Sequence, residues 1–205
     1  MSRRSGGGIL PRAFYARDTL TVARALIGKV LVHATPSGAT AGSIVEVEAY
    51  IGESDPACHA SSGFTPRNAP LYGPPGQAYV YLNYGMHFLV NAVTEPEGAP
   101  GAVLLCALEP LEGVDLMWRR RARPSQAPRS RVTHLDLCRG PGNLSRALGI
   151  SLSENRMDLT GDRLFVMDRG LESGPVAWSR RVGIRVGTDR QWRCFLASSP
   201  CVSRQ

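Results

Sequence analysis

Hydrophobic and polar residues alternate most regularly at residues 44–50, where the sequence reads IVEVEAY. A period of two is typical of a strand and divides the segment into two faces. One face carries Val45, Val47 and Ala49, and the other carries Glu46, Glu48 and Tyr50. The two carboxylates are then about 7 Å apart. At that distance, mutual repulsion is expected to raise the pKa of one of them.

Other short apolar stretches predict further strands. Residues 79–82 and 86–93 are predicted to form a hairpin, because Gly85 suits the left-handed backbone of the turn between them. Tyr84 would then project from the tip, either packed against a neighbouring loop or free to insert into a base stack. Additional strands are expected at residues 29–33, 102–108, 164–167, 182–186 and 192–196.

Helix signals lie between these strands. A helix is predicted to start after Asp18, whose carboxylate can cap it, and to end at Gly28. Residues 111–121 suit an amphipathic helix, and a turn at residues 140–143 precedes a helix that ends near Gly149. With the strands, this pattern predicts the α+β class: a compact mixed domain with helices beside the sheet and a protruding β-hairpin.

Domain organisation follows from composition. Residues 1–10 are rich in Arg, Ser and Gly and are predicted to be a disordered basic tail. Residues 11–205 contain no repeat and no linker, so they are expected to form a single domain. The chain has 205 residues, of which 43% are hydrophobic, enough for a self-supporting core.

Charge and cysteine usage narrow the class of protein. The net charge is +7, from 23 arginines and the single lysine Lys29, and favours a polyanionic partner such as nucleic acid. Five cysteines without a CxxC pair indicate neither a disulfide framework nor a zinc site. No apolar run suggests a signal peptide or membrane span, so a cytoplasmic protein is expected.

The single lysine also bears on chemistry. An enzyme that cleaves a glycosidic bond with an amine nucleophile needs a lysine or a free N-terminus. Lys29 lies in a helix-to-strand segment far in sequence from the acidic strand. Water is therefore the better candidate nucleophile.

Seven blocks of the sequence, between about residues 17 and 203, resemble the alkyladenine (3-methyladenine) DNA glycosylase family in the same order. They are residues 45–50 (VEVEAY), 55–59 (DPACH), 65–68 (TPRN), 79–86 (YVYLNYGM), 107–113 (ALEPLEG), 137–138 (LC) with 140–141 (GP), and 181–183 (RVG).

The resemblance implies a monofunctional glycosylase that excises alkylated or deaminated purines from duplex DNA. It implies a mixed fold with a curved antiparallel sheet, hydrolysis without a cofactor or metal, and no lyase activity. A monomer of the bacterial type is expected, associated with the nucleoid and needing no obligate protein partner. The substrate stays open among 3-methyladenine, 7-methylguanine, hypoxanthine and ethenoadenine.

The resemblance also implies residue roles. Glu48 matches the general base that activates the attacking water, and Tyr84 matches the intercalating wedge. The base pocket would be formed by Tyr50 on one wall, His59 and Tyr81 on the other, Asn91, which crowds the exocyclic amine of guanine, and the backbone carbonyl of Val182, which holds the water.

Cys106 is the sharpest departure, because the family usually has an arginine there that is expected to contact the catalytic water and nearby phosphates. A neutral thiol leaves a second reading open, a DNA-lesion-binding protein with reduced or lost hydrolysis, unless Arg185 substitutes. A third reading is a hydrolase of free nucleosides, which would need neither Tyr84 nor an arginine-rich surface. Arg67 and Arg139, in loops beside the matched blocks, are the predicted phosphate contacts.

Overall fold

The computed structural model describes residues 7–122, 132–171 and 174–203. Residues 1–6 of the predicted tail lie outside this range, but its last two residues are attached to the sheet. Ile9 bridges to Met167, and the Leu10 amide donates a hydrogen bond to the Val166 carbonyl at 2.8 Å. Leu10 is also buried. The packed part of the chain therefore begins before Pro11.

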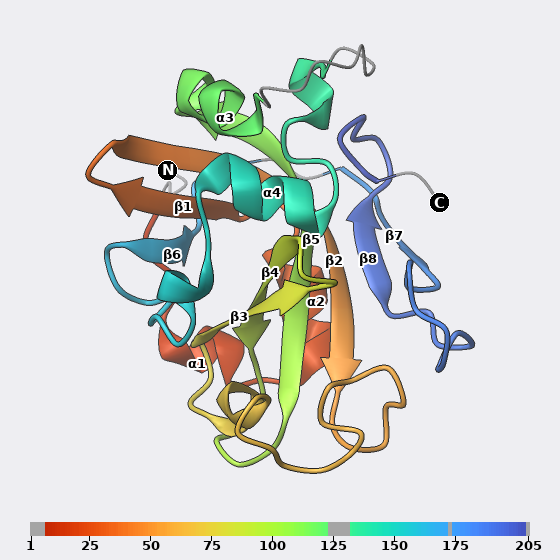
Figure 1. Ribbon diagram of the computed structural model, residues 1–205. Coiled ribbons are helices and arrows are strands. Elements are labelled where there is room, and N and C mark those ends of the chain that lie inside the picture. The colour runs from red at the N-terminus through yellow and green to blue at the C-terminus, as the bar shows by residue number, and fades with distance from the viewer. Residues whose placement is uncertain (1–6, 123–131, 172–173, 204–205) are drawn as a thin grey trace, which may run out of the picture.

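The described residues form one eight-stranded sheet in which every pairing is antiparallel (Figure 1). Its main path runs β3-β4-β5-β2-β1-β6, and β8 joins β7 to β2. The strands are β1 (Val30–Thr35), β2 (Gly38–Ile51), β3 (Ala78–Asn83), β4 (His87–Val93), β5 (Gly101–Glu112), β6 (Leu164–Met167), β7 (Val176–Ser179) and β8 (Arg193–Leu196). The predicted α+β class with a curved antiparallel sheet is confirmed.

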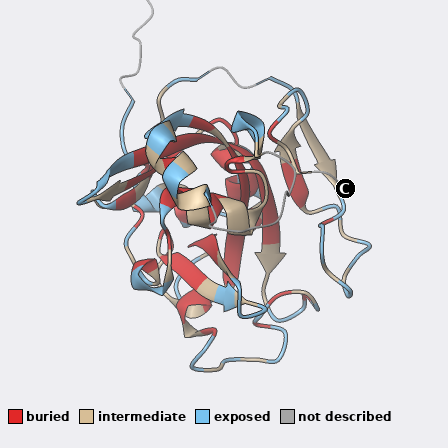
Figure 2. Ribbon diagram, turned by 45° about the horizontal axis from the view of Figure 1, so that its top comes forward, coloured by how far each residue is buried: buried red, intermediate tan, exposed pale blue. Residues whose placement is uncertain are grey.

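The longest strand, β2, organises the sheet because it is paired along both edges. β5 follows one edge, whereas the other edge pairs first with β1 and then, at residues 46–48, with β8. This change of partner brings the C-terminal part of the chain beside the two glutamates. Side chains of β2 also pack into separate apolar clusters, and residues 40–49 are all buried (Figure 2).

A β-bulge at Val45 corrects the predicted division of β2 into two faces. The register with β5 shifts between Ile44 and Glu46, so Val45 is an extra residue on this strand. Val45 consequently packs with Ala107 and Cys201, in a cluster separate from the main core that contains Val47. Strict alternation holds only after the bulge.

Two other strand predictions have different outcomes. The hairpin is confirmed as β3 and β4, with Tyr84 and Gly85 at its tip. The strand predicted at residues 182–186 is wrong, because this segment is a loop in which Gly183 and Gly187 have φ of 77° and 60°. The strand nearby is β7, which ends before Arg180.

The helices are short and pack against the curved sheet. They are α1 (Arg12–Tyr15), α2 (Thr19–Leu26), α3 (Val114–Arg121) and α4 (Pro141–Leu148), with 3-10 turns η1 (Ala69–Tyr72), η2 (His134–Asp136) and η3 (Leu152–Glu154). The Asp18 cap is confirmed by a 2.9 Å hydrogen bond from the Thr21 amide. The helix predicted at residue 111 starts at Val114, because β5 continues to Glu112.

The main core joins α2, α3 and α4 to the strands. The C-terminal end of α4 is held by α3, since Arg120 donates hydrogen bonds to the Leu148 and Ala147 carbonyls at 2.7 and 3.2 Å. A smaller apolar cluster of Leu89, Leu104 and Cys106 lies apart from this core, against Tyr50 and Tyr81. That second cluster forms part of the lining of a cavity.

Candidate active site

A cavity of about 480 Å³ lies between the sheet, the loop after β2 and residues 182–184. Its lining includes every base-pocket residue and the general base predicted from the sequence: Glu48, Tyr50, His59, Tyr81, Asn91 and Val182. Tyr84 also contributes to the lining. The structure thus brings together side chains from β2, β3, β4 and two loops.

Glu48 is 3% exposed and accepts two hydrogen bonds. The Val182 amide donates to Oε1 at 2.7 Å, and the Tyr50 hydroxyl donates to Oε2 at 2.8 Å. Burial raises the pKa of Glu48 above its usual value, and these two hydrogen bonds oppose that rise only in part. The predicted repulsion from Glu46 contributes in the same direction, but less than burial.

Glu46 has a different environment two residues earlier on β2. Its Oε1 pairs with Arg193 Nε at 2.7 Å inside the protein, where the two side chains are 1% and 2% exposed. The Ser203 amide and hydroxyl donate two further hydrogen bonds to this carboxylate, at 2.7 and 2.6 Å. Glu46 is therefore a fully paired structural carboxylate, although it lies at the cavity wall.

Aromatic rings also line the cavity. The His59 and Tyr81 ring centroids lie 4.5 Å apart, and His59 Nδ1 is hydrogen-bonded to the Tyr79 hydroxyl at 2.8 Å. Loss of solvent around the imidazole, and next the positive charge of Arg67, lower the pKa of His59. A neutral imidazole at pH 7 leaves this wall suited to stacking.

The remaining lining is mainly apolar, with one oriented amide. Leu89, Leu104 and Cys106 are buried together, and burial raises the pKa of the Cys106 thiol well above its usual value. The thiol stays neutral and contacts the Leu104 carbonyl at 3.6 Å. Asn91 donates from Nδ2 to the Tyr79 carbonyl at 3.0 Å, which fixes the orientation of its amide.

Val182 reaches the site through its backbone. The observed contact is its amide on Glu48, whereas the resemblance implied a role for its carbonyl, which stays a prediction. The preceding residue, Arg181, is buried against Asp55 of the loop after β2, with Nη1 to Oδ2 at 2.5 Å and Nη2 to Oδ1 at 2.8 Å. This pair anchors the loop that carries Val182.

Tyr84 is 80% exposed, so the reading in which it packs against a neighbouring loop does not hold. Its φ is 48° and that of Gly85 is 67°, and the Met86 amide donates to the Asn83 carbonyl at 3.0 Å. Two consecutive left-handed residues make the tight turn that matches strand twist. The turn holds an aromatic ring out in solvent at the cavity mouth.

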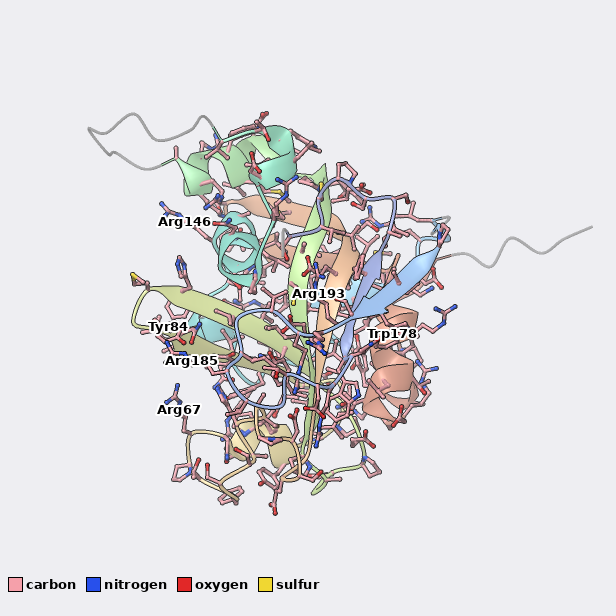
Figure 3. The ribbon with its side chains drawn as sticks, turned by 90° about the vertical axis from the view of Figure 1, so that its right-hand side faces the viewer. Arg67, Tyr84, Arg146, Trp178, Arg185 and Arg193 are labelled. Atoms are coloured by element: carbon pink, nitrogen blue, oxygen red, sulfur yellow. The ribbon has the colours of Figure 1, made fainter. Side chains whose placement is uncertain are left out.

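The predicted phosphate-binding arginines differ in their surroundings. Arg67 is exposed and lies with Arg185 and Tyr84 along one side of the molecule (Figure 3). Arg139 instead pairs with Asp136 at 2.9 Å and donates to the Pro200 carbonyl. Arg185 is exposed and is not among the residues that line the cavity with Cys106, so it does not substitute for the missing arginine. The contacts of Arg67 and Arg139 with phosphates stay predictions.

Sequence reasoning missed several supporting residues: Asp55, Tyr79, Arg181, Arg193 and Ser203. Asp55, Tyr79 and Arg181 stand inside matched blocks, which was the available signal, and Asp55 pairs with Arg181. Their pairing joins residues 126 positions apart, and local periodicity carries no information about such contacts.

In the described ranges, no helix is both long and apolar enough to cross a membrane. Within the same part of the chain, no group of three or more His, Cys, Asp or Glu side chains is arranged to hold a metal ion.

A buried carboxylate beside an aromatic pocket, with an exposed tyrosine at its mouth, is an arrangement suited to acting on an extruded nucleobase. Residues 13–200 match the family model described as methylpurine-DNA glycosylase (MPG). The chain belongs to this family.

Similar proteins from distant organisms carry one shared name, "Putative 3-methyladenine DNA glycosylase". The protein of Chlorobium phaeobacteroides is 45% identical over 193 residues, which cover 93% of this chain and 92% of that protein. The Anaeromyxobacter dehalogenans protein is 49% identical over 199 residues, 95% of this chain and 85% of the relative. The Clostridium acetobutylicum protein is 42% identical over 198 residues, 95% and 97% of the two chains.

Proposed function

We propose that this protein is a monofunctional DNA glycosylase that rotates an alkylated or deaminated purine out of duplex DNA and hydrolyses its N-glycosidic bond. The observation that carries the proposal is Glu48, a buried carboxylate at the wall of an aromatic cavity. Its pKa is raised, and among the described residues it has no ion-pair partner. A base with a raised pKa is better matched to proton transfer near neutral pH.

In the proposed reaction, Glu48 accepts a proton from a water molecule while the water oxygen attacks C1′ of the deoxyribose. The bond from C1′ to the purine nitrogen breaks, and its electron pair leaves with the base. An alkylated purine carries positive charge and leaves readily, so the protein needs chiefly to aim the water and stabilise an oxocarbenium-like sugar. The carboxylate of Glu48 can serve both purposes.

Recognition of the base would use the aromatic walls. An extruded purine would stack between Tyr50 on one side and His59 with Tyr81 on the other. Tyr84 would enter the helix and fill the gap, as apolar and aromatic wedges do in kinked DNA. Asn91, held by Tyr79, would crowd the exocyclic amine of guanine, and damaged pairs cost less to open than intact ones.

DNA binding would rely on the basic surface at the cavity mouth. Arg67 and Arg185 are exposed on the same side of the molecule as Tyr84 (Figure 3), where they would meet the phosphates beside the extruded base. Each phosphate contact contributes a slope of about −0.9 to log K against log salt. A flat salt response would favour the nucleoside-hydrolase reading instead.

Absence of lyase activity is part of the proposal. Lys29 is absent from the cavity lining and is paired with Asp168 at 2.5 Å, so its amine is not available for Schiff-base chemistry there. Borohydride treatment during turnover should therefore trap no covalent DNA adduct. From the resemblance to the alkyladenine DNA glycosylase family, we also propose that the protein acts as a monomer without a cofactor or an obligate protein partner. It would work in the cytoplasm, on nucleoid DNA.

The decisive experiment is single-turnover release of free base from a panel of duplexes, each with one lesion: 3-methyladenine, 7-methylguanine, hypoxanthine or ethenoadenine. Glu48→Gln should lower the release rate by about 10²–10⁴-fold, the usual contribution of a general base, while lesion binding persists. The amide keeps the shape of the carboxylate but cannot accept the water's proton. Release by Glu48→Gln within a few-fold of wild type would contradict the assignment.

The lesion-binding reading rests on the buried, neutral Cys106, which supplies no charge to the water or to a phosphate. Wild-type protein that binds every lesion and releases none would favour that reading. Rescue of release by Cys106→Arg would then identify the missing charge as its cause.

A further inference from the structure

We propose that Arg181 is a positioning residue of this site: through its buried ion pair with Asp55, it sets the Val182 amide and the Tyr50 ring against Glu48. This inference rests on the proposed function, because it assigns Arg181 a role in preparing Glu48 as a base. It concerns a residue outside the cavity lining.

Arg181 connects three segments of the chain, and we call its buried ion pair with Asp55 the clamp. Its guanidinium makes a bidentate pair with Asp55, at 2.5 and 2.8 Å, and both side chains are fully buried. It also donates to the Ala49 carbonyl of β2 at 3.0 Å and to the Gly187 carbonyl at 3.3 Å. One side chain thereby connects β2, the loop after β2 and the loop at residues 180–191.

The same guanidinium lies over two aromatic rings. Its Cζ is 4.6 Å from the Tyr50 centroid and 5.2 Å from that of Trp192. Tyr50 also lines the cavity, and it donates its hydroxyl hydrogen to Glu48. Arg181 therefore supports, from behind, a ring proposed to stack on the base.

Chain connectivity links the clamp to the second donor on Glu48. Val182 follows Arg181 directly, and its amide meets Oε1 at 2.7 Å. Arg190 ties the far end of this loop to the Ser54 carbonyl at 2.8 Å, whereas residues 182–186 belong to no strand and Val182 is 41% exposed. Both hydrogen bonds that Glu48 receives thus depend on groups that Arg181 holds.

Nearby backbone amides hold the Asp55 carboxylate in place for its pairing with Arg181. It also accepts hydrogen bonds from the Ala57 and Ile51 amides at 3.2 and 3.3 Å, so the loop turns around its carboxylate. Although burial alone would raise its pKa, the bonds from Arg181 bring the pKa of Asp55 below its usual value. The carboxylate therefore stays charged and keeps the clamp closed across the neutral range.

Close packing against Gly187 indicates how little the clamp can shift. A Cβ at residue 187 would lie 3.1 Å from Arg181 Nη2 and 3.3 Å from Asp55 Oδ1. The φ of Gly187 is 60°, a conformation that also favours glycine. Even alanine would press on the ion pair from outside the cavity. Gly187→Ala is accordingly a mild way to disturb the clamp.

Loosening the clamp has a definite consequence for pH dependence. The groups that act on Glu48 are Glu46 and Tyr50 of β2, Tyr81 of β3, Cys106 of β5, and Arg181 with the Val182 amide. Of these, only Val182, Tyr50 and Arg181 favour the carboxylate form. Weakening them moves the acid limb of the rate profile to higher pH.

The test is the pH profile of single-turnover excision for Arg181→Lys, Arg181→Gln and Gly187→Ala, with the folded fraction measured at each pH. Arg181→Lys keeps the charge but cannot bridge Asp55 and two carbonyls, and should slow excision by about 10- to 100-fold at pH 7, the loss of one charge-assisted hydrogen bond. The acid limb of the rate profile should move to higher pH for all three variants, and furthest for Arg181→Gln. Should Arg181→Gln not fold, the other two variants decide.

Two controls separate positioning from loss of structure. Arg190 also approaches Asp55, at 3.9 Å, stacks on Trp192 and donates to the Ser54 carbonyl, but its side chain is half-buried and does not lie over Tyr50 as that of Arg181 does, so Arg190→Lys should leave the acid limb unchanged. Leu164→Ala in β6 weakens the core away from the cavity and should lower the folded fraction without moving the limb.

An acid limb at the wild-type position in Arg181→Lys and Gly187→Ala, after correction for folded fraction, would overturn the inference. If Glu48→Gln excises normally, the proposed function fails first. If Glu48→Gln is inactive and the clamp variants match their controls, only the role of Arg181 fails.

Discussion

Glu46 and Glu48 stand two residues apart on one strand, and the protein treats them in opposite ways. Glu46 has an arginine at 2.7 Å and two donors from Ser203, whereas Glu48 has a tyrosine hydroxyl and one backbone amide. A direct cation satisfies a buried carboxylate and makes it structural. Neutral donors keep it oriented but leave its pKa raised, so the difference between the two residues lies in their partners.

The largest expected effect is a difference in the free energy of unfolding between Glu46→Gln and Glu48→Gln. Glu46→Gln leaves Arg193 buried without its counter-ion and should lower the free energy of unfolding by about 3–5 kcal/mol. Glu48→Gln removes a buried charge that has no ion-pair partner among the described residues, and it should leave stability unchanged or slightly higher. Urea unfolding of both variants checks the contrast.

A double variant distinguishes the pair from the individual side chains. Replacing Glu46 and Arg193 together by Leu and Met removes both charges and should recover most of the loss. Equal losses for Glu46→Gln and Glu48→Gln would remove the distinction between the two carboxylates.

A second, smaller effect is the pH dependence of stability that Glu48 itself contributes. Its pKa in the folded protein is raised, so folding favours the protonated form. The stabilisation is complete below the pKa of the unfolded chain and disappears as pH rises through the folded pKa. The stability of wild type relative to Glu48→Gln should fall between about pH 4 and the neutral range.

This difference is measured by urea titrations of both proteins at a series of pH values. A relative stability that rises with pH over the same range would mean that Glu48 is better stabilised as an anion than its two hydrogen bonds imply.

The smallest expected effect comes from making Glu48 resemble Glu46. Cys106 lies in the cavity wall next to Glu48, and Cys106→Arg would place a cation there. The pKa of Glu48 should then fall, and the acid limb of excision should move to lower pH by about one unit, the shift given by a carboxylate next to an arginine. Cys106→Met is the matched control for side-chain size and should leave the limb in place.

Sequence patterns predicted the parts of this protein that depend on local order. The cap at Asp18, the hairpin turn and the strand containing both glutamates follow from periodicity and turn chemistry, and the resemblance added the roles of the pocket residues. The bulge at Val45 was not predictable, because it depends on the register with β5. The partners that distinguish Glu46 from Glu48 were also hidden, since Arg193 and Val182 lie more than 130 positions further along the chain.

The loop at residues 180–191 shows the limit most clearly. Its apolar residues suggested a strand, but Gly183 and Gly187 have positive φ and the segment is a loop. The contact that holds its start, between Arg181 and Asp55, joins residues 126 positions apart and could not be read from the local pattern.

The change of partner along β2 has a consequence for synthesis on the ribosome. The strand is translated as residues 38–51, yet the groups that complete its two carboxylates are Val182, Arg193 and Ser203. N-terminal segments emerge first, so a nascent chain carries these glutamates long before their partners exist. The proposed base, Glu48, therefore lacks the Val182 donor until that residue has been translated, and an interrupted polypeptide that ends before residue 181 holds the acidic strand without this hydrogen bond.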